Sequence, residues 1–457
     1  MTLAPAPAAA VGSAVAEHAR FLKGRGAAAP PWLHELRARA LARVEALGLP
    51  TVRQEAWRFT PVARIADTAF RLADSGPTNA AELVGRVALP DAVRIVLLNG
   101  RFSSELSRLD QLPAGVVAGS LARAIADGRP ELAHLGLVPF EAHPFAALNT
   151  AFLEDGVIVS VRKGAVVDRP IQVIVVDGGA GVLMAHPRTL VALGANSQAS
   201  LVQTFVGGAG HVHLTNGVTE IALGENATLD YVHDQRETDD AYHFASLQVR
   251  CDRASTFHGR TVTLGGHLVR NDFGATLAGE GAHCTMDGCY LVDGDRLVDN
   301  HTTIDHAVPH CTSHELFKGI LDGRARAVFN GRIIVREDAQ KTDSRQTNRA
   351  LLLSDDATIN SNPQLEIFAD DVKCTHGAAI GQLDEEALFY LRARGLTARD
   401  ARDLLIHAYA GEVLAGIRHE GLRQQLERSL FVQLDRDLAD HGGQPVRDDC
   451  AGRGDRA

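Results

Sequence analysis

One cysteine and one histidine stand two residues apart in the segment NSNPQLEIFADDVKCTHGAAIG, which runs from residue 360 to residue 381. If this β-leaning segment is a strand, alternate side chains point the same way, so Cys374 and His376 share one face. A thiolate and an imidazole suit zinc, copper, or iron with sulfide. Two donors do not complete a four-coordinate site, so the other ligands must come from elsewhere in this chain or from another subunit. The alternative is structural, because a lone Cys often packs as a small apolar residue and a lone His is often a satisfied core residue.

A second group of metal-ligating residue types lies in the segment HTTIDHAVPHCTSHELFKG. Its members are His301, His306, His310, Cys311 and His314. The histidine spacing would suit one face of a helix, but Thr, Ile and Val favour a strand here, on which the imidazoles need not converge. The group supports an alternative function, a metal-dependent β-fold enzyme of the cupin type. The sequence has no G-x-x-x-x-G-K-[ST] phosphate loop, no G-x-S-x-G and no H-E-x-x-H.

The residues that must position these side chains form a long run of short β-type segments. Between residues 156 and 381 helical periodicity is absent, and Gly, Asp and Asn divide the chain into short strands. A loose repeat places an alanine after a turn, at positions 199, 227, 254, 282, 325 and 357. Small residues at regular intervals are typical of crowded corners in stacked coils. The sequence therefore predicts a mainly β protein with a parallel β-helix or flattened solenoid at residues 156–381, and a jelly roll or double cupin as the alternative.

Helical segments are expected before this core. Residues 1–30 are rich in Ala and Pro and are predicted to be a disordered leader. Residues 31–155 predict a mixed, mainly helical N-terminal domain, with an amphipathic helix over residues 32–47 and a buried strand within residues 91–100. Trp57 and Phe59 are interpreted as packing anchors under a loop.

Helical segments are also expected after the core, where residues 382–440 predict a C-terminal helical domain. Asp384 is the expected N-cap of its first helix, and Thr397 opens a capping box for the second. A third helix is expected around residues 422–440. The polar faces of these helices could dock a partner. Residues 441–457 are predicted to be a disordered tail in which Cys450 is incidental.

Composition excludes several classes of function. The net charge of -10 and a pI near 6.0 argue against a nucleic-acid surface. Six cysteines without a C-x-x-C pair make no disulfide framework and fit a reducing cytoplasm. The first residues do not resemble a signal peptide, and no apolar run is long enough to span a bilayer, so no membrane association is expected. The missing signal peptide disfavours a secreted, polysaccharide-acting β-helix.

Several segments resemble the SufD subunits of the SUF iron–sulfur cluster assembly system, in the SufB/SufD family. They are EAWRFTP, HPFAALNTAFLEDGVIVSVRKG, FKGILDGRARAVFNGRIIV, and the long stretch from LLLSDDATINSNPQLEIF to DLLIHAYAGEVL that contains DVKCTHGAAIG. The likeness runs from about residue 55 to residue 420. The sister subunit SufB has a stretch more like His-Glu-Ala in place of CTHGA and an additional cysteine motif, so SufD is the better match.

The resemblance implies a right-handed parallel β-helix between helical ends, a heterodimer with SufB through the β-helix, and docking of the ATPase SufC on the C-terminal helical domain. The family's C-S-H-G stretch maps onto Cys374 and His376, with Thr375 in place of Ser. The resemblance links the His to cluster assembly at the SufB interface. ATP would enter only through SufC, and the nascent iron–sulfur cluster would be held transiently and shared with SufB. The chain is then a non-catalytic scaffold, and it could form a homodimer when isolated.

Overall fold

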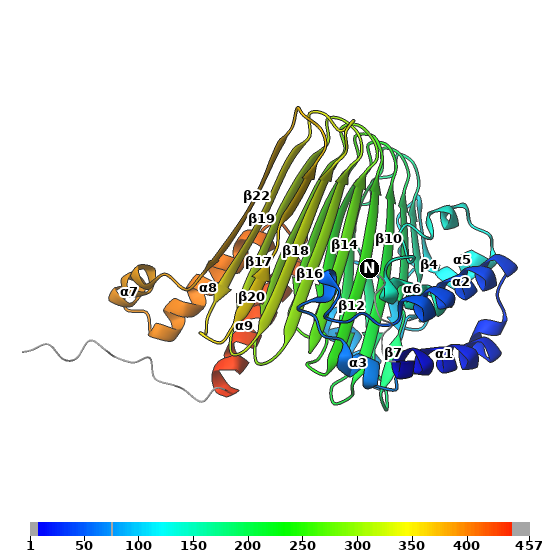
Figure 1. Cartoon of the computed structure of the whole chain (residues 1–457), viewed down its shortest axis with the longest axis horizontal. Helices are drawn as coiled ribbons and strands as arrows, with labels where there is room; N and C mark the ends of the chain where they lie inside the picture. The colour runs from blue at the N-terminus through cyan, green and yellow to red at the C-terminus, as the bar shows by residue number, and fades with distance from the viewer. Residues whose placement is uncertain (1–7, 75, 441–457) are drawn as a thin grey trace, which may run out of the picture.

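The computed structural model describes residues 8–74 and 76–440 of the 457-residue chain. The first seven residues, and the predicted tail at residues 441–457 with Cys450, lie outside the described residues. Two long sheets stack along the middle of the molecule, with helices at both ends (Figure 1).

The first sheet, called sheet one, has 12 strands in the described part of the chain. In spatial order its main path is β20 (Thr358–Ser361), β18 (Arg326–Val335), β16 (Leu297–His306), β14 (Leu268–Leu277), β12 (Ala241–Cys251), β10 (His213–Leu223), β8 (Arg188–Leu193), β5 (Val157–Val161) and β4 (Val116–Ser120), and the short strands β1 (Arg71–Leu72), β7 (Leu183–Ala185) and β21 (Gln364–Ile367) lie off this path.

The second sheet, called sheet two, has 10 strands in the same described part. Its spatial order is β22 (Lys373–Gly381), β19 (Asp343–Leu352), β17 (Thr312–Leu321), β15 (His283–Val292), β13 (Thr256–Thr263), β11 (Thr228–Gln235), β9 (Gln198–Gly207), β6 (Ile171–Asp177), β2 (Val93–Leu98) and β3 (Arg101–Phe102).

Successive strands of each sheet pair in parallel, one coil apart along the chain. Thr228 of β11 pairs with Thr256 of β13, and Asp343 of β19 pairs with Lys373 of β22. Antiparallel pairing between the described strands is confined to β2 with β3 and β4 with β5, at the beginning of the fold. Parallel coils confirm the predicted β-solenoid. The jelly-roll or cupin alternative is wrong, because those folds are built from antiparallel strands.

Side chains alternate between the space enclosed by the two sheets, called the lumen, and the outer faces. On β19, Ser344, Gln346 and Asn348 are buried in the lumen, whereas Asp343 and Arg345 are exposed on the outer face. Most coils fill the lumen with stacked aliphatic and aromatic side chains that form the largest apolar core of the protein. The solenoid thus holds together through burial between coils rather than within one coil.

The predicted alanine repeat identifies the corners only in part. Four of its members are buried beside turns: Ala227, Ala282, Ala325 and Ala357. Ala254 instead lies in an exposed turn with a φ of 54°, and the neighbouring Ser255 takes the buried corner position. Ala199 lies within β9. The repeat fails there because another small residue, serine, occupies the corner: Ser197 and Ser255 are buried at the positions in register with Ala227.

The N-terminal helices cover the outer face of sheet one and its first coils (Figure 1). They are α1 (Ala8–Lys23), α2 (Pro31–Leu47), α3 (Ala63–Asp67), α5 (Leu121–Ala126) and α6 (Pro144–Ala151), with 3-10 turns at Arg25–Ala27, Glu55–Trp57 and Pro130–His134. Helix α4 (Ala80–Val87) is the exception among the described N-terminal helices, because it packs on sheet two. The helix predicted over residues 32–47 is confirmed as α2, and the strand predicted within residues 91–100 is β2. Because β2 and β4 belong to the two sheets, the coils begin before residue 156.

The prediction of a disordered leader at residues 1–30 is wrong for its described part. Helix α1 packs against α2, α3 and the C-terminal end of α6: Phe21 is buried, and His18 Nε2 lies 2.9 Å from the carbonyl oxygen of Ala151. An alanine-rich segment has high helix propensity, and a few apolar side chains suffice to dock it. Of the two expected aromatic anchors, Trp57 is buried but Phe59 is 43% exposed.

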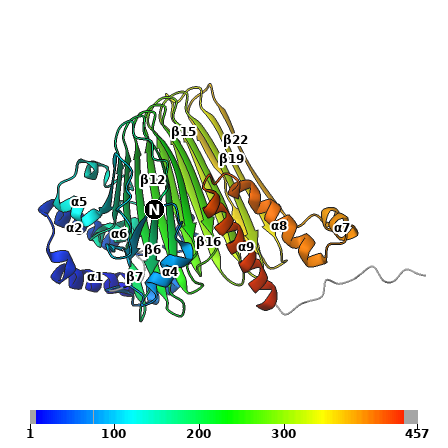
Figure 2. The same cartoon turned by 180° about the vertical axis from the view of Figure 1, so that it is seen from behind.

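The C-terminal helices α7 (Glu385–Ala393), α8 (Ala398–Leu414) and α9 (Glu420–Asp440) follow β22. The Asp384 side chain accepts hydrogen bonds from the amides of Glu386 and Ala387, and Thr397 accepts one from Asp400, so both predicted caps are confirmed. Helices α8 and α9 pack on the outer face of sheet two (Figure 2). Among the described helices, none combines the length and hydropathy that crossing a lipid bilayer requires.

Candidate functional site

Cys374 and His376 lie on β22, the strand at the end of sheet two. This strand pairs with β19 on one side, and no described strand pairs with its other edge. Cys374 is half-buried and His376 is exposed. Both occupy lumen-facing positions, because they pair with the buried Ser344 and Gln346 of β19. The structure thus places the thiol and the imidazole together on one face, at the open end of the solenoid.

The Cys374 thiol packs against the last residues of the lumen core. Burial raises its pKa, the charge of Asp343 raises it further, and a backbone hydrogen bond at Ser344 opposes them. The side chain is therefore a neutral thiol near neutral pH. Because the thiolate is the form that binds metal, a cation or a base must take its proton before it can act as a ligand.

Polar side chains continue from this end into the lumen. His306 Nε2 lies 2.9 Å from Ser313 Oγ, and Ser313 Oγ lies 2.8 Å from Ser344 Oγ, directly below Cys374. In the neighbouring column Gln346 Nε2 donates a 2.6 Å hydrogen bond to Glu315 Oε2. Burial lowers the pKa of His306 to about 4, and burial raises the pKa of Glu315 to about 7. Hydrogen-bonded polar side chains thus line the lumen of the last coils, directly beneath the candidate site.

These lumen residues were not identified from the sequence, apart from His306 as a member of the histidine group. A signal was present, because polar residues alternate in Ser313–Glu315 and Ser344–Gln346 at positions where a half-buried strand would place apolar ones. Only the pairing of β17 with β19 shows that Ser313 stacks on Ser344 and that Glu315 stacks on Gln346.

The histidine group at residues 301–314 does not converge. His301 faces outward, with Nε2 2.9 Å from Asp299 Oδ1, whereas His306 points into the lumen. His310 lies in a turn with a φ of 60° and His314 on the outer face of sheet two, near Asp287. Within residues 8–74 and 76–440, no group of three or more His, Cys, Asp or Glu is arranged to hold a metal ion. Strand alternation separates these imidazoles, so the structure gives no support to the metal-dependent enzyme.

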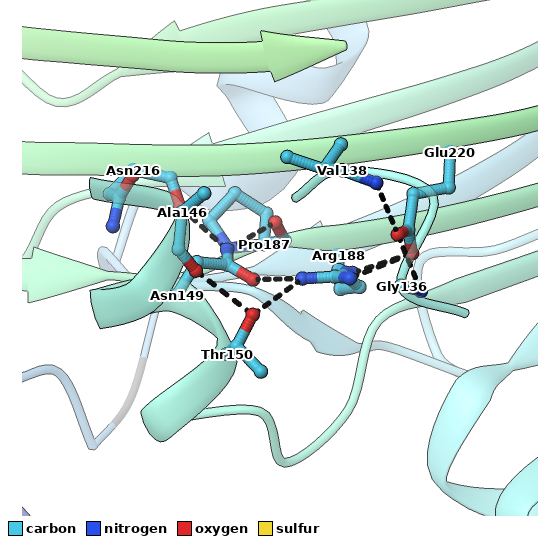
Figure 3. A network of polar contacts seen from close by, with 9 residues as sticks. All are labelled: Gly136, Val138, Ala146, Asn149, Thr150, Pro187, Arg188, Asn216 and Glu220. Carbon is cyan, nitrogen blue, oxygen red and sulfur yellow. Dashed lines mark hydrogen bonds and ion pairs between the residues drawn. The ribbon is translucent and has the colours of Figure 1, made fainter. Parts of the chain in front are cut away.

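A second feature missed by the sequence is a buried polar network that joins α6 to sheet one (Figure 3). The Arg188 guanidinium pairs with Glu220 at 2.7 Å and donates to Asn149 Oδ1 at 3.0 Å. Glu220 also accepts hydrogen bonds from the amides of Gly136 and Val138. Because the described partners satisfy both charges and the network is sealed from solvent, we interpret it as structural.

The C-terminal helices present an apolar surface next to the open end. On α7 and α8 the side chains of Phe389, Tyr390 and Leu404 are 75%, 57% and 47% exposed. A cavity of about 330 Å³ lies between β22 and α8, with Ile380 and Leu405 in its lining. Large exposed apolar side chains that gather in one region are typical of an interaction surface.

Comparison with known proteins agrees with this geometry. The model of the "SUF system FeS cluster assembly, SufBD core domain" matches residues 175–409, and that of the "SufBD protein N-terminal region" matches residues 26–173. An iron–sulfur cluster assembly SufBD family protein of Synechocystis is 35% identical, over 84% of this chain and 87% of that protein. The iron–sulfur cluster assembly protein SufD of Escherichia coli is 31% identical, over 83% of this chain and 88% of that protein, and SufD of Bacillus subtilis is 25% identical, over 87% and 93%. The chain therefore belongs to the SufBD family of the SUF iron–sulfur cluster assembly system.

Proposed function

We propose that this chain is a SufD-type scaffold that helps to build a nascent iron–sulfur cluster at an interface with SufB. The observation that carries the proposal is the position of Cys374 and His376 on one face of the strand that ends the solenoid. Membership of the family gives the chain its role in cluster assembly. The cluster is cargo: Cys374 and His376 offer a sulfur and a nitrogen donor, and a second subunit supplies the rest of the shell.

The open edge of β22 supports the partner assignment. An edge strand presents backbone N–H and C=O groups that a strand of another chain can pair with. Most of β22 is exposed, and Ile380 is 52% exposed. We propose SufB as the occupant of this edge, and a second copy of this chain when SufB is absent.

The apolar surface of α7 and α8 supports docking of the ATPase SufC. The sequence has no phosphate loop of its own, so nucleotide hydrolysis would occur on SufC and reach the solenoid through α8, which packs against β15 and β17. The chain itself performs no catalysis in this proposal. We assign the complex to the cytoplasm. We propose residues 31–155, 156–381 and 382–440 as the N-terminal, solenoid and C-terminal domains, with β2 and β4 of the N-terminal domain joining the two sheets of the solenoid.

The test is replacement of His376 in the complex co-expressed with SufB and SufC. We expect His376→Ala to lower iron and acid-labile sulfide per complex by about tenfold, the typical scale for loss of a group near a metal, with subunit ratios unchanged. Thr375→Ala is the matched control, because Thr375 lies on the same strand and faces the other way. A normal cluster yield in purified His376→Ala complex would overturn the proposal.

A further inference from the structure

His376 is the last member of a column of lumen side chains. It pairs in register with Gln346 of β19, and Gln346 pairs with Glu315 of β17. Neighbouring strands lie about 4.8 Å apart, so the three side chains follow one another toward the open end. Gln346 and Glu315 are 1% and 0% exposed, whereas His376 is exposed. The column therefore connects a buried carboxyl group to the candidate site.

The amide of Gln346 has a defined orientation. Its Nε2 lies 2.6 Å from Glu315 Oε2, and because an ionised carboxylate only accepts hydrogen bonds, the NH₂ group must face Glu315. Its Oε1 is buried and has no hydrogen-bond partner among the described residues. Buried polar atoms are normally paired, so this acceptor requires an explanation.

The opposite wall of the lumen is shaped to this amide. Gly331 on β18 faces it, and a Cβ at Gly331 would lie 2.4 Å from Gln346 Nε2 and 2.7 Å from its Cδ. Gly331 has no positive φ, so the glycine is needed for space and not for backbone conformation. The absence of a side chain there leaves room for the amide in the orientation that Glu315 requires.

We propose that Gln346 is a positioning residue for His376: it offers Oε1 to one ring N–H of His376, and Glu315 and the space at Gly331 hold its amide in that orientation. One ring nitrogen of His376 is then held by Gln346, and the other keeps its lone pair toward the open end, where it can act as a ligand. This inference rests on the proposed function of His376, and it adds the residues that fix the orientation and tautomer of its ring.

The ionisation of Glu315 follows from its surroundings. Burial raises its pKa to about 7; among the charged neighbours, Asp287 on β15 raises the pKa and His314 on β17 lowers it. Across the lumen, β16 places the buried His306, whose pKa burial lowers to about 4, so it is neutral. Arg345 of β19 lies on the outer face. Above pH 7 the carboxylate holds the amide NH₂ group. Below pH 7 the protonated carboxyl can itself donate, so the amide can turn over and present Oε1 to Glu315, and this acceptor is then lost to His376.

The first test uses histidine-selective 15N NMR on the full-length chain, with the His376 resonances assigned by their loss in His376→Ala. At pH 8, where Glu315 is ionised, we expect a single tautomer of His376. Glu315→Gln is nearly isosteric but can donate as well as accept, so it no longer fixes the Gln346 amide and should give a mixture of tautomers. Gln346→Leu removes the acceptor and should also give a mixture. Gly331→Ala should do the same by displacing the amide. Ser344→Ala, on the same strand but in the neighbouring column, should leave His376 unchanged.

The second test measures cluster yield in the complex with SufB and SufC. Gln346→Leu should lower the yield about tenfold without changing subunit ratios, and Glu315→Gln should remove the rise in yield as the pH passes 7. If His376→Ala abolishes assembly but folded Gln346→Leu and Glu315→Gln proteins keep wild-type His376 spectra, the positioning role is wrong and the proposed function stands. If His376→Ala has no effect on yield, the proposed function itself fails.

Discussion

Arg188 Nη2 lies 2.7 Å from Glu220 Oε2 inside the interface between α6 and sheet one, where the two side chains are 3% and 0% exposed. Neither charge can reach water if the other is removed. The pair therefore ties the N-terminal helices to the solenoid (Figure 3), and α6 lies far from β22, the strand that carries Cys374 and His376 (Figure 1).

Glu220→Gln is expected to lower the free energy of unfolding by about 3–5 kcal/mol, because it leaves the Arg188 guanidinium buried without a counter-charge. Urea denaturation measures the loss. Glu82→Gln is the matched control: Glu82 pairs with Arg86 on an exposed helix surface, and such pairs contribute about 0–1 kcal/mol. Equal effects of the two substitutions would contradict the interpretation of the buried network.

Gly288→Ala is expected to destabilise the solenoid by about 1–3 kcal/mol or more, because the new Cβ would lie 2.3 Å from Cε1 of Phe317 on the next coil. Gly377→Ala tests the same change on β22, where nothing lies within 4 Å of an added Cβ. Thermal unfolding of both variants should show a lower Tm for the first alone. A similar Tm for both would mean that the lumen can relax around the extra methyl group.

Cys374 should react slowly with alkylating reagents at neutral pH, because burial and the charge of Asp343 raise the pKa of its thiol. The other described cysteines are buried, so in a Cys450→Ala background mass spectrometry should find Cys374 as the main site of modification. The rate should still rise with pH above the range where an ordinary free cysteine has levelled off. Asp343→Asn should speed the reaction at a given pH, and an unchanged rate would exclude the electrostatic contribution.

Phe389→Glu on α7 should weaken co-purification with SufC while the Tm stays within about 1 °C, since surface substitutions away from packed features change stability little. Phe389 is 75% exposed. Val52→Glu, at a 50% exposed apolar position in the N-terminal part of the chain, is the control and should not affect SufC recovery. Normal SufC recovery with Phe389→Glu would remove α7 from the docking surface.

The sequence by itself determined the features that depend on near neighbours in the chain. Strand alternation put Cys374 and His376 on one face, and the caps at Asp384 and Thr397 marked where helices begin. The run of short strands with small residues at their turns indicated stacked parallel coils. In each case the cause lies within a few residues, in backbone geometry or a local hydrogen bond.

Only the tertiary structure decided what surrounds these residues. Glu315 and Gln346 lie under His376 because the length of each turn sets the register between coils, and the same register puts Ser255 and not Ala254 in the corner next to Ala227. Helix α1 packs on α2, α3 and the end of α6, where Phe21 contacts Phe152 and the Arg37 guanidinium. Contacts between coils and between distant helices depend on how the whole chain packs, and no local pattern records that.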